Sequence, residues 1–583
     1  MDAVQSALRI IDSLLGENED ICGLPSKNGG CGFVVFAVGL GMELGCSQFP
    51  RATRQTVGAK LRIGSTWKDR YLSSTNVKIQ PIGPIFKRHI TSKGSTADPG
   101  SAPDRERVVI LGSGWGGYTL SRRLSPSKFY PTVVSPRSYF VFTPLLTDAA
   151  AGSLNFSEIV EPVRDRKSQV HYIQAAARSV DFNKKTVMVE ACVVKSGVTE
   201  SPRVERSERE TDQGPQIGNL RGKEALRKWE AGQVFEVPYD KLVIAVGCVS
   251  RTFNTPGVRQ NAMFFKDIGD AKRVKRRVRE CFELAVMPTT SFELRKNLLH
   301  FAIVGAGPTG TELAAALCDF LHDDMFQIYP KLKDSTRITL YDVAPKVLSM
   351  FDKTLSDYAM TVMSREGVEV KTNHHIQELR WGEPHKDPAP EMDPKGCLTL
   401  KTKEGGEEGV GMCVWATGNE MNKFVNDSLG PLEQFPTFSA LFQPGHTSPN
   451  DPKSVAWKIK KAPKTGALLV DNHLRVQLES EDGRGAVMQD VFALGDNCML
   501  ESDSPPTTAQ ATNQEACWLA KRLNKGGIGQ EPGFSFKNFG MIAYLGSSKA
   551  LMQIPSSEHL PKGIKGRTAC QNERYEEFEF IDQ

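Results

Sequence analysis

Two glycine-rich segments hold the residues whose types and spacing most clearly indicate a chemistry. The first places Gly112, Gly114 and Gly117 in the pattern G-x-G-x-x-G, and a later segment repeats the spacing at Gly305, Gly307 and Gly310. In such a pattern the first glycine permits a tight turn and the second lets a pyrophosphate approach the backbone. The third lets the helix pack closely on the preceding strand. The phosphates then lie at the helix start, where free backbone N–H groups point at them. The spacing therefore predicts two dinucleotide-binding sites.

The elements around each turn have the arrangement that this chemistry needs. A strand-like RVVILG from Arg107 precedes the first turn, a helical pattern follows it, and YPTVVS forms the next strand. The second unit begins at His300 with HFAIVG and ends with RITLYD. A helical crossover joins parallel strands in such β-α-β units. The two units indicate a duplicated dinucleotide-binding domain.

The residues at the strand ends differ between the two units. Asp342 ends RITLYD, and a carboxylate there can accept both ribose hydroxyls of NAD while it repels the extra phosphate of NADP. This favours NADH, although an ordinary exposed strand-end aspartate would look the same. Ser135 ends the first unit's strand without an acid, which suits a flavin nucleotide better than NAD. Asp496, in VFALGDN, is placed to bind the ribityl or pyrophosphate part of a flavin.

One unit interrupts the other along the chain, which predicts an α/β protein with two Rossmann-type domains. We expect a leader and linker at 1–104, an FAD-binding domain at 105–262 and 429–533, an NAD(H)-binding domain at 263–428 and a short C-terminal segment at 534–583. Polar residues at 196–230 and prolines at 435–465 indicate surface insertions. A basic amphipathic helix near Asp267 is most simply a solvated face.

Composition excludes several classes of protein. The chain has 583 residues and a net charge of only +5, which does not favour nucleic-acid binding. Its 12 cysteines are sparse for a disulfide scaffold, and they form no CxxC pair and no metal-ligand spacing. No apolar run is long enough for a transmembrane helix. The basic, Ser- and Thr-rich stretch 45–94 suits a mitochondrial presequence, with a basic disordered leader as the alternative.

Over roughly residues 105–550 the sequence resembles the type II, rotenone-insensitive NADH:ubiquinone oxidoreductases, also called alternative NADH dehydrogenases, in their fungal mitochondrial form. The similar segments are VVILGSGWGGYTLSRRL, SYFVFTPLL, FAIVGAGPTGTELAAAL, VWATG, VFALGDN, TTAQATNQEACWLAKRLN and FKNFGMIAYLGSSKA. The resemblance implies an FAD-binding and an NADH-binding Rossmann-type domain, followed by a membrane-facing C-terminal segment.

The resemblance also implies roles for individual residues. Those expected around FAD are Gly112, Gly114, Gly117, Thr143, Pro144 and Asp496. Those expected around NADH are Gly305, Gly307, Gly310, Glu312, Asp342 and Gly418. The family's AQ-xxx-Q motif, near the quinone and the flavin, matches Gln510 and Gln514, which lie four apart on one helix face. Solvated glutamines are the alternative. Glu312 either handles a proton near the flavin or satisfies backbone donors at its helix start.

The implied activity is oxidation of NADH through non-covalent FAD, with electrons passed to ubiquinone in the respiratory chain and no proton pumping. The flavin supplies the chemistry, and the protein supplies position and electrostatics. The resemblance implies a peripheral location on the inner mitochondrial membrane, on either face, and allows a homodimer.

Two other classes of flavoprotein fit less well. A disulfide reductase needs two closely spaced redox cysteines at the flavin, and Tyr118–Ala191 contains none. The same gap counts against a sulfide:quinone reaction. A flavoprotein similar to apoptosis-inducing factor, which acts through partners, would not need the glutamine motif.

The resemblance fades after about Lys565, where the chain ends in the acidic TACQNERYEEFEFIDQ. Family members end instead in an amphipathic segment with Trp, Arg and Tyr that lies on the bilayer. Because anionic membrane surfaces bind basic amphipathic helices, this ending predicts weaker membrane attachment and poorer use of long-chain quinones. No EF-hand loop is present, so we expect no control by calcium.

Overall fold

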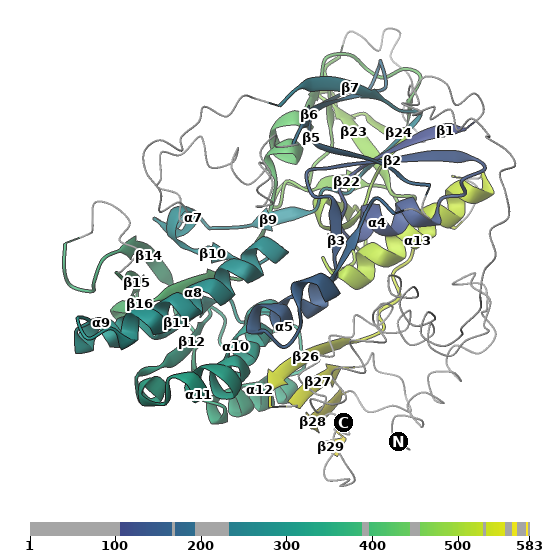
Figure 1. Ribbon diagram of the computed structural model, residues 1–583. Helices are drawn as coiled ribbons and strands as arrows, with labels where there is room; N and C mark the ends of the chain where they lie inside the picture. The colour runs from purple at the N-terminus through teal and green to yellow at the C-terminus, as the bar shows by residue number, and fades with distance from the viewer. Residues whose placement is uncertain are drawn as a thin grey trace, which may run out of the picture.

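A computed structural model gives the fold of this chain (Figure 1). It describes residues 105–165, 169–192, 232–387, 396–442, 455–526, 528, 532–547, 549–553, 563–567 and 579–580. The expected leader at 1–104 and the expected insertion at 196–230 lie outside the described residues, as do most of the acidic residues at the chain end.

The larger of two main sheets is built around the first glycine turn. Its parallel centre follows the order β24-β8-β1-β2-β5. These strands are β1 (Glu106–Leu111), β2 (Phe129–Ser135), β5 (His171–Asp181), β8 (Lys241–Ile244) and β24 (Gly485–Ala493). β24 lies beside β8 although the whole second unit separates them in the sequence. The chain therefore leaves this domain and returns to it.

Further strands extend this sheet at both edges or pair with strands within it. They are β6 (Thr186–Ala191), β7 (Val234–Pro238), β19 (Pro431–Leu432), β20 (Ala440–Phe442), β21 (Trp457–Ile459), β22 (Leu468–Val470), β23 (Arg475–Ser480) and β25 (Cys498–Leu500). The prediction of a surface insertion at 435–465 is wrong for its described residues, because β20 pairs with β24 and β21 with β23. Trp457 and Ile459 alternate inward and are buried, and Trp457 contacts the ring of Phe435. This apolar alternation outweighs the flanking prolines.

The second main sheet carries the second glycine turn. Its strands are all parallel, in the order β10-β17-β11-β12-β13. They are β10 (Met263–Phe264), β11 (His300–Val304), β12 (Arg337–Tyr341), β13 (Val368–Lys371) and β17 (Met412–Trp415). Along β11, Phe301 and Ile303 pack among the helices, whereas Ala302 and Val304 pack toward a three-stranded antiparallel sheet. That sheet is β14 (Ile376–Trp381), β15 (Leu398–Thr402) and β16 (Gly406–Val410).

The helices cover these sheets and begin at local signals in the sequence. The basic helix α8 (Ile268–Val286) starts at Asp267, whose side chain accepts from Ile268 N–H in a capping box with Asp270. The other α-helices are α4 (Trp115–Arg123), α5 (Leu146–Ala151), α7 (Val258–Asn261), α9 (Phe292–Leu298), α10 (Pro308–Phe320), α11 (Phe326–Ile328), α12 (Lys353–Arg365) and α13 (Ala509–Lys525). The short 3-10 and π turns are η3 (Thr143–Leu145), η4 (Phe156–Glu158), η5 (Leu321–Met325), η6 (Pro330–Ser335), η7 (Phe424–Ser428) and η9 (Gly495–Asn497).

The C-terminal segment forms a small antiparallel sheet that lies on the second domain. Its strands are β26 (Met541–Gly546), β27 (Lys549–Gln553), β28 (Gly563–Arg567) and β29 (Glu579–Phe580). β26 packs on α10, and Figure 1 shows these yellow strands beside α10 and α12. Tyr544 Oη donates to Asp319 Oδ2 over 2.6 Å and fastens the sheet to the end of α10. Among the described residues, no helix combines the length and the apolar composition needed to cross a bilayer.

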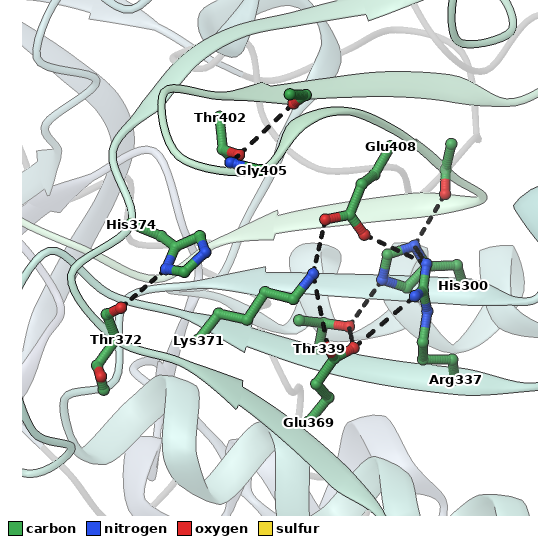
Figure 2. Close-up of polar contacts among 12 residues, drawn as sticks. His300, Arg337, Thr339, Glu369, Lys371, Thr372, His374, Thr402, Gly405 and Glu408 are labelled. Carbon is green, nitrogen blue, oxygen red and sulfur yellow. Dashed lines mark hydrogen bonds and ion pairs between the residues drawn. The ribbon is translucent and has the colours of Figure 1, made fainter.

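A buried histidine lies where β11 and β12 begin, on the side of the second main sheet that faces β16 (Figure 2). His300 Nε2 is 2.8 Å from Thr339 Oγ1, and Nδ1 is 2.8 Å from Gly409 O. Burial and, as a smaller cause, the nearby Arg337 guanidinium lower the pKa of His300 to about 3. The imidazole is therefore neutral at physiological pH and acts as a structural hydrogen-bonding group.

Charged residues beside His300 also connect the second main sheet to the three-stranded sheet that contains β16. Lys371 Nζ on β13 lies 2.6 Å from Glu408 Oε1 on β16, and Arg337 bonds to the other oxygen of Glu408 over 3.3 Å (Figure 2). Glu369 lies near both cations. The charges balance within the cluster, so its geometry supports a structural role.

Candidate functional site

The two glycine turns have the same backbone geometry. Gly112 has φ +107° and Gly305 has φ +108°, which side chains other than glycine rarely adopt. A Cβ atom added to Gly117 would lie 2.0 Å from Gly112 O, and one added to Gly310 would lie 1.8 Å from Gly305 O. The fold itself therefore requires the first glycine of each turn for its positive φ. It requires the third glycine because the helix approaches the turn closely there.

The middle glycines differ from the others because a side chain there would have room. Gly114 and Gly307 are the N-caps of α4 and α10, with φ −77° and −72°, and a Cβ on either would meet no atom within 4 Å. Neither helix start has a side-chain cap at that position. Open space therefore lies beside each helix start, which fits the pyrophosphate of a dinucleotide.

The strand-end residues give the two turns different charges. Asp342 Oδ2 accepts from Ala306 N–H over 2.5 Å, and Oδ1 accepts from Ala344 N–H over 2.7 Å. The carboxylate is thereby held against the second turn. At the corresponding place in the first unit, Ser135 Oγ lies 3.0 Å from Ser113 Oγ, and both hydroxyls are buried. The second turn therefore carries an acid where the first carries a neutral pair.

Thr143 and Pro144 lie next to the first turn. Thr143 Oγ1 accepts from the indole N–H of Trp115, the first residue of α4, over 2.9 Å. Pro144 is buried in the turn η3 that leads into α5. The fold thus brings Thr143, with Pro144 next to it in the chain, to the start of the same helix as Gly114; contact of either residue with FAD stays a prediction.

Asp496 lies in the turn η9, which bonds to the segment at 247–248 and to α13. Asn497 Oδ1 accepts from Gly247 N–H over 3.1 Å, and Cys248 Sγ–H donates to Asp496 Oδ2 over 3.2 Å. Burial raises the pKa of the Cys248 thiol to about 12, while Lys266 opposes and Asp496 adds to this shift. Cys248 is therefore a neutral donor at this site. No local signal in the sequence indicated its contact with Asp496.

Glu515 supports the same turn from α13 and was also absent from the sequence-based residues. Its Oε2 accepts from Gly495 N–H over 2.7 Å, and the side chain is only 5% exposed. Burial raises the pKa of Glu515 to about 7; the Gly495 N–H opposes the shift and Asp496 adds to it. A carboxyl group that is partly protonated near neutral pH thus lies beside Asp496.

Gln510 and Gln514 both hold the segment that leads to the C-terminal sheet. Gln510 accepts from Phe539 N–H over 3.1 Å and donates to Gly540 O over 3.3 Å. Gln514 accepts from Lys537 N–H over 3.0 Å and donates to Lys537 O over 2.8 Å. The alternative of a solvated glutamine is wrong for Gln510, which is buried, whereas Gln514 is partly exposed although its amide pairs with backbone groups.

Glu312 connects the second turn to the same C-terminal sheet. It is buried in the first half of α10, and its Oε1 accepts from Tyr544 N–H of β26 over 3.3 Å. It thus meets a backbone donor of another element, which differs from a role confined to the start of its own helix. Whether it also handles a proton stays a prediction.

Gly418 lies where the two domains meet. It follows β17 with φ +71°, and a Cβ there would lie 2.9 Å from Phe253 Cζ. The next residues form β18 (Asn419–Met421), which pairs antiparallel with β9 (Cys248–Ser250). This two-stranded crossover places Cys248 at the first turn's site and Gly418 at the second.

Comparison with known proteins agrees with this double site. Residues 106–431 match the family model described as pyridine nucleotide-disulphide oxidoreductase. A protein of Dictyostelium discoideum described as "Probable NADH dehydrogenase" is 30% identical over 78% of this chain and 82% of its own length. The chain belongs to the pyridine nucleotide-disulphide oxidoreductase family, and within it to the alternative NADH dehydrogenases.

Other members of the family show how far the similarity extends. The external alternative NADH-ubiquinone oxidoreductase of Yarrowia lipolytica is 31% identical over 79% of this chain and 66% of its own length. The alignment covers only 50% of the external alternative NAD(P)H-ubiquinone oxidoreductase B2 of Arabidopsis thaliana. NDH2 from Plasmodium falciparum, solved in complex with NADH, shares the fold with a TM-score of 0.58 at 21% identity over 79% of this chain and 92% of that one.

Proposed function

We propose that this alternative NADH dehydrogenase oxidises NADH through a non-covalently bound FAD and delivers the electrons to ubiquinone. One observation carries the proposal. Two turns of matching geometry open toward empty space at the starts of α4 and α10, and only the second has a strand-end carboxylate. The names of the fungal relatives, which are NADH-ubiquinone oxidoreductases, support the same reaction.

We assign FAD to the first turn. Gly112, Gly114 and Gly117 would hold its pyrophosphate, Thr143 and Pro144 would line the start of α4, and Asp496 would bind the sugar-phosphate part. When bound, FAD supplies the redox chemistry, which is hydride acceptance from NADH and delivery of two electrons to a quinone. The chain's own part is to place these groups. Glu515 and Cys248 support that placement because both bond to the η9 turn.

We assign NADH to the second turn, with Gly305, Gly307 and Gly310 at its pyrophosphate. Asp342 would accept the ribose hydroxyls and repel the extra phosphate of NADPH. Its two oxygens already bond to backbone N–H groups, which orients the carboxylate toward the turn. Gly418 closes the same site from the end of β17.

We propose that Gln510 and Gln514 act on the quinone side as positioning residues. Both side chains fasten 537–540 to α13, and this segment leads directly into β26. Glu312 fastens β26 to α10. The three residues thus hold the C-terminal sheet against both domains. A quinone bound between the C-terminal sheet and the two domains would therefore depend on these hydrogen bonds.

For location, we propose a peripheral protein of the inner mitochondrial membrane, with a homodimer as its assembly. The names of the Yarrowia, Saccharomyces cerevisiae and Arabidopsis relatives include the word mitochondrial, which supports the organelle. The basic stretch 45–94 suits targeting, although it lies outside the described residues. Membrane contact and the dimer rest on the resemblance.

The test is NADH oxidation by the purified flavin-loaded protein with three acceptors, namely a short-chain quinone, ferricyanide and the disulfide DTNB. The proposal expects turnover with the quinone and ferricyanide and none with DTNB. Substitution Gln510→Ala should raise the KM for quinone more than the KM for ferricyanide. FAD binding without quinone turnover would refute the proposed function and favour a flavoprotein that acts through partners.

A further inference from the structure

The loop after β9 has an unusual backbone and an unusual exposed ring. Phe253 and Asn254 have φ +53° and +56°, a conformation that residues with side chains seldom adopt. The ring of Phe253 is 54% exposed. Strained backbone of this kind persists where the surrounding structure enforces it, and it is common at ligand-binding positions. The loop is therefore a candidate for contact with a ligand.

Contacts place this loop beside the second glycine turn. A Cβ on Gly305 would lie 2.7 Å from Thr417 Cβ, and one on Gly418 would lie 2.9 Å from Phe253 Cζ and 3.0 Å from Arg251 Cβ. The end of β17 is thus packed between the turn on one side and the loop on the other. Residues 251–253 form an outer wall there.

Two hydrogen bonds fix the loop in this place. The indole N–H of Trp415 donates to Arg251 O over 2.9 Å, and Arg251 N–H donates to Gly418 O over 3.3 Å. Trp415 is buried in β17, so the backbone of Arg251 is tied to the strand that borders the turn. The backbone position from which the Arg251 side chain extends is therefore fixed.

The guanidinium of Arg251 has no carboxylate within ion-pair distance among the described residues. Its central carbon lies 5.0 Å from the centroid of the Phe253 ring, and the residue is exposed. An arginine laid on an aromatic ring keeps its donors in a plane, and those donors match phosphate oxygens well. The free charge and its support therefore suit an anionic ligand at the second turn.

We propose that Arg251 and Phe253 form the outer wall of the pyridine-nucleotide site, with Arg251 binding the diphosphate of NADH and Phe253 holding the guanidinium in place. This inference rests on the assignment of NADH to the second turn. Arg251 belongs to the loop between the domains, so the FAD domain's side of the molecule contributes to NADH binding. The simpler interpretation is a surface pair that only stabilises the loop.

The experiment measures binding of ADP-ribose to the flavin-loaded protein by calorimetry. ADP-ribose has the diphosphate and adenosine of NADH but no nicotinamide, so it cannot react. We expect Arg251→Ala to weaken ADP-ribose about tenfold, as loss of one charge-assisted hydrogen bond would, and to leave adenosine affinity unchanged. Arg251→Lys keeps the charge without the planar donors and should weaken ADP-ribose about threefold.

The matched control is Arg259→Ala, which removes an exposed arginine from α7, a helix that packs on β14. It should bind ADP-ribose as the wild type does. In steady-state assays, Arg251→Ala should raise the KM for NADH about tenfold with kcat unchanged, because the bond is equally strong in the bound and transition states. Phe253→Leu should raise it about threefold, since it removes the ring below the guanidinium.

Three results would overturn the inference. The first is an affinity of Arg251→Ala for ADP-ribose within twofold of that of the wild type. The second is an equal loss of affinity for adenosine and for ADP-ribose. The third is a loss of flavin content or thermal stability in Arg251→Ala that Arg251→Lys does not restore. Failure of the proposed function is distinct from these. A wild type that binds ADP-ribose but gives no quinone turnover would refute that function. The affinities of the wild type and the variants for ADP-ribose could still be compared.

Discussion

The two glycine turns of this protein have nearly the same backbone and different surroundings. Gly112 and Gly305 differ by one degree in φ, and Gly114 and Gly307 both face open space. The strand-end neighbours, however, are a buried pair of hydroxyls in one case and a carboxylate in the other. The two turns thus share a backbone geometry that suits a pyrophosphate, and they differ in the strand-end groups beside it.

A second difference lies in how each half uses its carboxyl groups. Asp342 sits at the surface of the second turn, held by two backbone N–H groups. Glu515, which supports the first half's η9 turn, is buried and has a pKa of about 7. The first half thus keeps a buried carboxyl group that is partly neutral near pH 7, and the second half holds a partly buried carboxyl group against its glycine turn.

The largest expected effect comes from filling the open space at the middle glycines. Gly114→Ala and Gly307→Ala are compatible with their φ values and meet no protein atom. Gly114→Ala should lose FAD. Gly307→Ala should keep FAD and bind NADH on the order of a thousandfold more weakly, because a displaced phosphate loses about two charge-assisted hydrogen bonds of about 2 kcal/mol each. Flavin absorbance per protein and the KM for NADH measure both effects.

The comparison breaks if the two alanine variants have the same phenotype. Loss of FAD from Gly307→Ala alone would mean that the two turns have been assigned to the wrong nucleotides. Loss of FAD from both variants would mean that the turns do not bind separate nucleotides independently. Thermal unfolding without added nucleotide provides the control, since neither alanine should introduce a clash.

Next in size is the pH dependence that Glu515 gives to stability. Its pKa in the folded protein, about 7, lies above the ordinary value of 4.5, so the folded state binds more protons than the unfolded state between these pH values. Stability should therefore fall as pH rises through this window and level off above it. The shift corresponds to about 3 kcal/mol. The variant Glu515→Gln has no carboxyl group to titrate at this position, so it should not show this loss of stability with rising pH.

Thermal melts of Glu515→Gln and the wild type at pH 5 and pH 8 measure this effect. The melting temperature of the variant minus that of the wild type should increase by a few degrees between the two pH values. A difference that stays constant, or that decreases, would show that Glu515 is ionised in the folded protein.

A smaller effect is expected for Asp342→Asn. The amide keeps one oxygen acceptor but loses the charge and faces one backbone N–H with another donor. The KM for NADH should rise about tenfold, about 1.4 kcal/mol, and the preference for NADH over NADPH should narrow. An unchanged preference would mean that selectivity lies elsewhere in the second half.

The smallest effect belongs to Ser135→Ala in the first half. It removes the hydroxyl pair and the bond that Ser135 Oγ accepts from Arg137 N–H, while Ser113 Oγ keeps its bonds to the carbonyl groups of Arg137 and Tyr139. We expect a loss of at most about 1 kcal/mol in stability and no change in the preference for NADH over NADPH. A change in that preference would place the pyridine nucleotide at the first turn.

Local patterns in the sequence were enough to predict the parts of the fold that depend on neighbouring residues. The glycine spacings, the strands beside them and the start of α8 at Asp267 all follow from short segments. The paired short strands β20 and β21 were missed because their partners, β24 and β23, lie further along the chain. The prolines around them, within 435–465, predicted an insertion instead.

The same distinction holds for the site. Gly112, Gly305 and Asp342 could be found from spacing, and Gln510 and Gln514 from the resemblance. Cys248 and Glu515 could not, because each acts through a contact with the η9 turn that only the folded chain creates. Arg251 could not be found from the sequence either, because only the folded chain places it beside Gly418.

The central claim is that one half of this protein holds FAD and the other delivers NADH to it for quinone reduction. Anaerobic titration of the purified flavoprotein with NADH, followed by addition of a short-chain quinone, tests it most directly. The account predicts that flavin absorbance bleaches with a stoichiometric amount of NADH and returns when the quinone is added. Absorbance that does not bleach with NADH, or that bleaches and does not recover with quinone, would contradict it.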